Sequence, residues 1–183
     1  MMRHFLLLVL ATILFIISNC RYSATPEMDL VLNDLVFLRD PEKTQEKIGS
    51  IDQMMDHLAD FPFIYLISID NKQYAKLFFY PGDTPNTISM IEIGYVDDSI
   101  ISDPHKIQIQ DTFQTENGLC LGMSEEDLKR IKGAPTRVDG QYYHYQWDEL
   151  FVLSHFNMPD YSETIRFSKD RKADFIQFGF SYP

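Results

Sequence analysis

Cysteine and histidine, which often supply a nucleophile, a general base or a metal ligand, are few and scattered in this sequence. The cysteines are Cys20 and Cys120, and the five histidines stand at positions 4, 57, 105, 144 and 155. The sequence contains no Gly-x-Ser-x-Gly, His-Glu-x-x-His or Cys-x-x-Cys motif and no phosphate-binding glycine loop. His144 and His155 could approach each other across a hairpin, which leaves open a hydrolase with an unrecognised site. We expect no catalytic residue, no bound metal and no cofactor.

An acidic cluster at residues 125–127 could supply a general acid and a general base, but its surroundings predict a helix start. Ser124 precedes the cluster as the N-cap, and an aspartate three residues later comes close to completing a capping box. The acidic residues suit the positive end of a helix dipole, and the basic residues between 129 and 132 suit its negative end. Gly133 and Pro135 then end the helix.

The N-terminal segment predicts export and a lipid anchor. The apolar run from Phe5 to Ile17 is too short to span a hydrocarbon core of about 30 Å, so residues 1–19 are typical of a signal peptide. The following Ile-Ser-Asn-Cys resembles the lipobox of bacterial lipoproteins, whose cysteine receives a diacylglycerol and becomes the mature N-terminus. The resemblance implies that Cys20 is acylated and holds the protein at the bacterial cell envelope, on the periplasmic or surface face of the outer membrane. Secretion after cleavage near Ser23-Ala24 is the alternative.

The net charge and the two cysteines limit which molecules the protein can bind and which disulfide it can form. The net charge of −11 argues against binding nucleic acid, whose phosphates need a basic surface. Contact with anionic lipid would need acyl chains rather than charge. If Cys20 is acylated, Cys120 has no intrachain partner and is most simply a small buried hydrophobe. A Cys20–Cys120 bridge in an exported protein is the alternative.

Two stretches of the chain resemble each other and predict an internal repeat. Ile48 to Pro62 aligns with Leu121 to Pro135 at matching glycine, acidic, apolar and proline positions. After each window the hydrophobic period changes to two, as in antiparallel strands. We therefore predict an α+β fold of two tandem helix-plus-antiparallel-meander repeats, with the helices packed on one sheet face. The expected divisions are a tether at 20–31, a first repeat at 32–106 and a second at 107–183.

The strands expected from this pattern, with approximate bounds, are Leu32–Leu38, Tyr74–Tyr80, Ile88–Val96, Tyr142–Asp148, Leu150–Phe156, Glu163–Ser168 and Asp174–Tyr182.

The second window carries a family resemblance. Its pattern consists of Gly118, Gly122, Met123, Ser124, Leu128, Gly133 and Pro135. It resembles the helix-entry motif of the β-lactamase-inhibitor-protein-like fold, which small outer-membrane lipoproteins also carry. The resemblance covers residues 107–183 and is degenerate at 45–96, where Ile51 and Asp60 replace the cap serine and the final glycine. It implies a non-enzymatic binding module and transfers no contact residue to this chain.

Alternation along the strands predicts which side chains face the core. We expect the inward residues to be Leu77, Phe79, Ile91, Ile93, Tyr95, Tyr143, Tyr145, Trp147, Ile176, Phe178 and Phe180. The opposite pleat then carries aromatic residues, methionine and a histidine, a composition found in protein interfaces. The candidate binding residues are Phe78, Tyr80, Met90, Tyr142, His144, Phe175 and Gln177, with Ile88 on the same pleat. The alternative is that this face packs against the other repeat or a loop.

These observations favour a membrane-anchored, non-enzymatic lipoprotein that binds or scaffolds an unidentified envelope protein. The second possibility is an inhibitor of a secreted hydrolase, such as a β-lactamase or a peptidase. Its acidic loop from Tyr95 to Asp103 would then enter the active-site cleft of that enzyme. A hydrolase built on His144 and His155 is the third.

Overall fold

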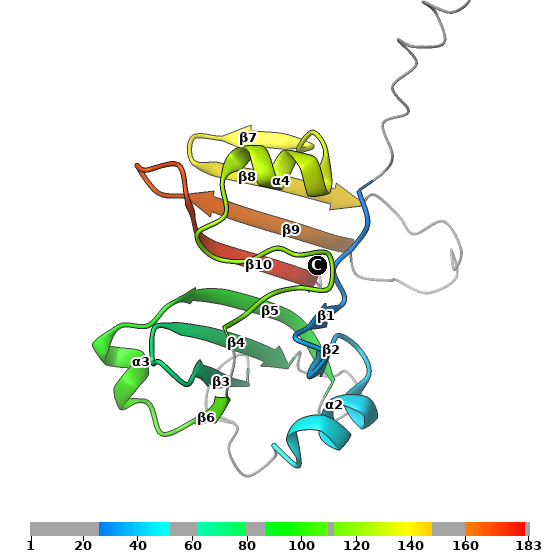
Figure 1. Ribbon diagram of the computed structural model, residues 1–183. Helices are drawn as coiled ribbons and strands as arrows, with labels where there is room; N and C mark the ends of the chain where they lie inside the picture. Colours follow the sequence, from blue (N-terminus) through cyan, green and yellow to red (C-terminus); the bar gives the residue numbers. More distant parts are fainter. Residues whose placement is uncertain (1–25, 52–61, 80–86, 110–111, 148–159, 182–183) are drawn as a thin grey trace, which may run out of the picture.

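The computed structural model describes residues 26–51, 62–79, 87–109, 112–147 and 160–181 (Figure 1). The described elements are β1 (Val31–Leu32), β2 (Val36–Phe37), α2 (Pro41–Ile48), β3 (Phe63–Ser68), β4 (Gln73–Phe79), β5 (Ile88–Tyr95), α3 (Asp98–Ser102), β6 (Lys106–Ile109), α4 (Glu125–Lys132), β7 (Arg137–Asp139), β8 (Tyr142–Trp147), β9 (Asp160–Phe167) and β10 (Ala173–Ser181).

One mixed sheet dominates the described chain. It contains eight of the described strands in the order β6-β3-β4-β5-β10-β9-β8-β7. The meanders β3-β4-β5 and β8-β9-β10 are antiparallel, and β5 pairs with β10 through partners that include Ile93 with Ile176. β6 lies parallel to β3, and the β1-β2 hairpin forms a separate pair.

The expected fold of two tandem helix-plus-meander repeats is wrong. The described chain is mostly β-sheet, with 48% strand and 17% helix, and its main sheet runs without a break through both halves. The strands β5 and β10 are alike in sequence because both are central strands buried on one face, where β-branched and aromatic residues pack well. Similar sequence in these two strands therefore does not by itself require two separate helix-plus-meander units.

The core lies on one side of the sheet, which we call the core face. Its buried side chains include Leu77, Ile91, Ile165 and Phe178, whose register places them on one pleat. α4 and the segment at 112–123 cover this face (Figure 1). α3 instead lies at the β3–β6 edge, so the described helices do not all pack on one face as expected.

The helix start at Ser124 is confirmed. Ser124 is the N-cap of α4, and its hydroxyl and the Asp127 side chain form a capping box. This hydroxyl is also the main cause that lowers the pKa of Asp127. Gly133 ends the helix with a φ of 75°, which glycine adopts at little cost.

Most expected strands are present, with small shifts at their ends. β4, β5, β8, β9 and β10 correspond to predicted strands, whereas β3, β6 and β7 were not predicted. The segment Leu32–Leu38 is a hairpin rather than one strand, because Asn33 and Asp34 turn the chain at φ values of 53° and 55°. The predicted strand Leu150–Phe156 lies outside the described residues, as does the predicted first helix from residue 52 on.

Candidate functional site

The side of the sheet opposite the core face, which we call the open face, gathers most of the candidate residues. Strand register places on it Phe63, Tyr65, Ile67, Tyr74, Lys76, Phe78, Met90, Glu92, Tyr142, His144, Gln146, Ser162, Thr164, Arg166, Phe175 and Gln177. Directly paired residues point to the same side, so a row across six strands can be followed. That row is Tyr65, Lys76, Glu92, Gln177, Thr164 and His144.

At one end of the open face, aromatic rings surround a lysine. The Lys76 Nζ atom lies 3.9 Å from the ring centroid of Phe63, 4.8 Å from that of Phe78 and 5.5 Å from that of Tyr65. These distances fit cation–π contacts. The three rings and Lys76 are half-buried, and we call them with Tyr74 the aromatic patch.

Tyr74 and Gly94 shape the middle of the open face. The Tyr74 hydroxyl donates a 2.8 Å hydrogen bond to Oε1 of Glu92, and its ring contacts Tyr65 edge-on at 5.6 Å. Burial, followed by this bond to Glu92, raises the pKa of Tyr74. The ring lies where a Cβ on Gly94 would come within 2.6 Å of its Cε1 atom. Glycine therefore allows the aromatic patch to lie close to β5.

The other end of the open face is polar. The His144 ring lies 3.1 Å from the Thr164 hydroxyl through Nδ1 and stacks on Tyr142 with centroids 6.3 Å apart. Burial, and then the charge of Arg137, lower the pKa of His144, which favours the neutral imidazole. Arg137, His144 and Thr164 contribute to a shallow pocket of about 490 Å³ at this end.

Arg166 and Phe175 connect the two ends. The Arg166 guanidinium lies 5.4 Å from the Phe175 ring centroid, and its Nε donates a 2.8 Å hydrogen bond to Oδ1 of Asp174. This bond is the main cause that raises the pKa of Arg166. The side chain therefore stays charged while its flat surface covers an aromatic ring.

All the predicted candidate residues that the structure describes lie on this face. Phe78, Met90, His144, Phe175 and Gln177 are half-buried, and Tyr142 is 40% exposed. Tyr80 lies outside the described residues.

Three details of the face differ from the sequence prediction. Ile88 is fully buried, because the β4–β5 register shifts between Phe78 and Phe79. Tyr95, expected in the core, is 49% exposed because it is the last residue of β5. Phe63 and Tyr65 were missed with the whole of β3, although the apolar run after Pro62 is a signal for a strand.

The Asp97 and Asp103 carboxylates in the acidic loop at 95–103 already accept hydrogen bonds from neighbouring residues. Residues 98–102 form α3, and the Asp97 carboxylate caps it by accepting hydrogen bonds from the N–H groups of Ser99 and Ile100. Hydrogen bonding, mainly from the Ser99 side chain, lowers the pKa of Asp97. Asp103 Oδ1 lies 3.2 Å from the His105 ring. These acids therefore stabilise the connection from β5 to β6.

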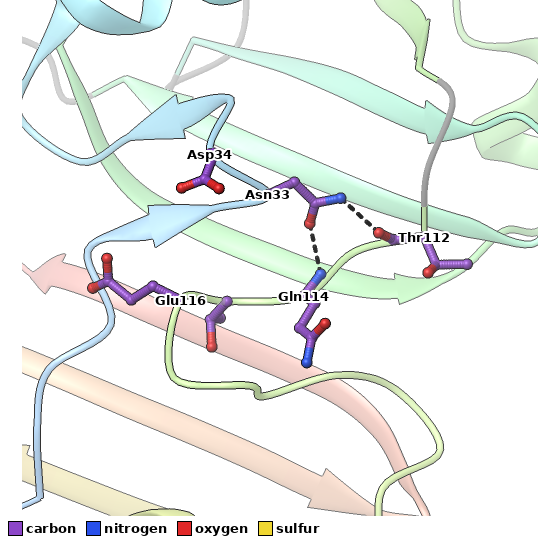
Figure 2. Close-up of a pocket in the computed structure, with 6 residues that line it drawn as sticks. Asn33, Asp34, Thr112, Gln114 and Glu116 are labelled. Carbon is purple, nitrogen blue, oxygen red and sulfur yellow. Dashed lines mark hydrogen bonds between the residues drawn. The ribbon is translucent and has the colours of Figure 1, made fainter.

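The β1–β2 turn borders a polar hollow of about 550 Å³ (Figure 2). The Asn33 amide nitrogen donates to the Thr112 carbonyl oxygen, and its amide oxygen accepts from the Gln114 N–H, both at 2.7 Å. Glu116 Oε1 accepts from the N–H of Leu30 at 2.7 Å. The polar groups in the hollow thus fasten the hairpin to the segment at 112–116.

Within the described part of the chain, the remaining chemical candidates form no catalytic arrangement. Cys120 is half-buried, and burial is the main cause that raises the pKa of its thiol, which disfavours the nucleophilic thiolate. Among the described residues, no group of three histidine, cysteine or acidic side chains could hold a metal ion. His155 and Cys20 lie outside these residues. In the same part of the chain, no helix has the length and apolar character needed to cross a membrane.

Comparison of the chain with protein-family models, curated proteins and solved structures finds no match.

Proposed function

We propose that this protein is a lipid-anchored, non-enzymatic component of the bacterial cell envelope that binds another envelope protein through the open face. The observation that carries the proposal is the aromatic patch, in which half-buried rings and Lys76 are displayed together on one pleat. Aromatic residues, methionine and arginine are enriched in protein interfaces, and a few such anchors supply most of the binding energy.

The geometry of the open face supports binding by a preformed surface. Six neighbouring strands hold its side chains in fixed register, so little conformational entropy is lost when a partner docks. Tyr74 with Glu92, and Arg166 with Asp174, already pair their polar groups. Such pairing leaves ring surfaces available and avoids charges that a partner would bury without compensation.

The proposed anchor is a lipid on Cys20, after removal of residues 1–19. An acylated N-terminus would hold this acidic domain at the membrane although anionic lipids repel it. Cys20→Ala should move the protein from the membrane fraction to the soluble fraction and abolish incorporation of radiolabelled palmitate. Membrane retention and undiminished labelling of the variant would refute the anchor.

The binding proposal is tested by replacing Phe78, Tyr142 and Phe175 with aspartate together. Detergent-solubilised envelopes would be passed over the immobilised wild-type protein and the variant. The variant should lose the protein captured by the wild type, with affinity at least about 30-fold lower, which corresponds to about 2 kcal/mol. Circular dichroism should show unchanged folding.

The matched control replaces Ile69, Tyr95 and Val138 with aspartate. These side chains are 59%, 49% and 51% exposed, and strand pairing places Tyr95 and Val138 on the pleat opposite the open face. The control adds the same charge, so it should capture the partner as well as the wild type does. Equal capture by the open-face variant would contradict the proposal.

A further inference from the structure

The segment at 26–30, expected to belong to a tether, is fastened to the folded body. In Figure 1 it runs past the ends of β8 and β9 towards β1. The indole nitrogen of Trp147 donates a 2.8 Å hydrogen bond to the Pro26 carbonyl oxygen, and the Asn117 side chain donates to the Met28 carbonyl oxygen at 3.1 Å. We call residues 26–30 the strap.

Beneath the strap lie three charged side chains that are almost completely removed from solvent. Asp29 and Glu163 are each 0% exposed, and Lys132 is 2% exposed. They come from the strap, from β9 and from the last turn of α4. Trp147 and Tyr161 border them, with the Lys132 Nζ atom 5.6 Å from the Trp147 ring centroid. Charged residues are rarely buried to this degree.

The three side chains are in direct contact. Lys132 Nζ donates a 2.8 Å hydrogen bond to Oε1 of Glu163 and lies 2.5 Å from Oδ2 of Asp29. The second contact is an ion pair between the ammonium and the carboxylate, and Nζ also donates to the carbonyl oxygen of Glu27. The other oxygen, Oδ1, accepts from the N–H of Asn117 at 3.1 Å. Oε1 of Glu163 also accepts from the Tyr161 hydroxyl at 2.9 Å.

Keeping two carboxylates and one ammonium charged in this buried site costs free energy. Removing each ion from water costs several kcal/mol, and Glu163 Oε2 also lacks a hydrogen-bond partner among the described residues. Burial is the main cause that raises the pKa of Glu163, to about 7, so this carboxyl exchanges protons readily near neutral pH. A reaction that removes charge from the site would relieve this cost.

We infer that Lys132 and Asp29 join spontaneously in the folded chain through an isopeptide bond between Nζ and Cγ, with Glu163 as the proton shuttle. The ammonium gives one proton to Glu163, and the resulting amine attacks Cγ of Asp29. Two of the three ammonium protons pass in turn through Glu163 to Oδ2, which leaves as water. The third proton stays on the amide nitrogen, and Glu163 ends in the protonation state in which it began. One C–N bond forms, one C–O bond breaks, and nothing is oxidised or reduced.

The hydrogen bonds at Asp29 match the needs of this condensation. Oδ2, the oxygen that must leave, contacts the ammonium whose protons it must receive, whereas Oδ1, which stays as the amide oxygen, accepts from the Asn117 N–H. That donor would stabilise negative charge on Oδ1 in the tetrahedral intermediate. Holding the amine and the carboxyl in contact corresponds to an effective concentration of about 10⁵–10⁸ M.

The bond would fix the strap covalently to the C-terminal end of α4. It does not depend on the open face or on a partner. If Cys20 carries the lipid, a pull on the anchor reaches the strap before β1. The amide would then transmit that load directly to α4.

Tryptic peptide mapping of the full-length protein purified from cells tests the inference. Cleavage after Arg21, Arg39, Arg130 and Arg137 should release one branched peptide that joins residues 22–39 to residues 131–137. Its mass should equal the sum of the two linear peptides minus one water molecule, and cleavage after Lys132 should be absent. Complete recovery of linear 22–39, 131–132 and 133–137 would overturn the inference.

Three variants assign the roles of the side chains. Lys132→Met removes the nucleophile and should abolish the branched peptide. Glu163→Gln keeps the shape but not the proton shuttle, and should slow formation of the bond by about 100-fold or more after refolding. Lys129→Met, on the exposed side of α4, is the control and should leave the branched peptide unchanged. If Glu163→Gln, with native circular dichroism, forms the bond as fast as the wild type, Glu163 is not the shuttle.

Discussion

Replacing Gly179 with alanine should destabilise the fold at the junction between β5 and β10. Gly179 stands opposite Met90 in the register and has a φ of 141°. An alanine Cβ there would lie 2.4 Å from the Ser89 carbonyl oxygen and 2.6 Å from the Met90 Cα atom. Both contacts are with backbone atoms, which cannot swing away. The two central strands would have to separate at this point.

The expected loss has two parts. The positive φ costs an alanine about 1–3 kcal/mol, and overpacking in a dense interior adds about 1–3 kcal/mol. The sum of about 2–6 kcal/mol is a large share of the 5–15 kcal/mol by which a typical domain is stable. Urea unfolding, followed by the fluorescence of Trp147, should show a lower midpoint with an unchanged slope.

Gly133→Ala is the matched control for this measurement. Gly133 has a φ of 75°, and a Cβ there would meet nothing within 4 Å. Only the conformational cost of about 1–3 kcal/mol should therefore appear. If Gly179→Ala is no more destabilising than Gly133→Ala, the close approach of β5 and β10 is refuted.

Two further predictions concern α4 and Glu163. Ser124→Ala removes half of the capping box and should lower the free energy of unfolding by about 1 kcal/mol in urea titrations, and an unchanged value would contradict this role. In the chain without the Lys132–Asp29 bond, the pKa of Glu163 is raised from 4.5 to about 7, so its contribution to stability is fully present below pH 4.5 and is lost as the pH rises through about 7. The loss amounts to about 3 kcal/mol, and Glu163→Gln should remove it from a plot of stability against pH. A plot of the same slope for the variant would exclude Glu163 as its cause.

Local features of the fold could be predicted from the sequence. The capping box needs only Ser124 and the residues of the following turn, and strand alternation placed Phe78, Met90 and Phe175 on one pleat without knowledge of the strand order. Both patterns depend on residues that are close in the sequence, because side-chain directions repeat regularly along a helix or a strand. Ile88 was misplaced because a register shift interrupts the alternation.

Features that depend on distant pairing could not be predicted in this way. The pairing of β5 with β10 and the parallel pairing of β6 with β3 are tertiary contacts. A lysine in the last turn of a helix is expected to be exposed and to complement the helix dipole there, as the sequence predicts for Lys132. Its burial is set by Asp29, more than 100 positions earlier, and by Glu163. No local pattern contains that information.

Site-specific photocrosslinking in living cells shows whether the protein binds its partner through the open face. A photoreactive amino acid placed at Phe78 or Phe175 reports on this face, and the same amino acid at Glu126 or Lys129 reports on the exposed side of α4. If the open face binds the partner, both open-face positions should crosslink to one and the same envelope protein, while the α4 positions do not. Crosslinks from α4 alone, or from neither side, would contradict binding through the open face.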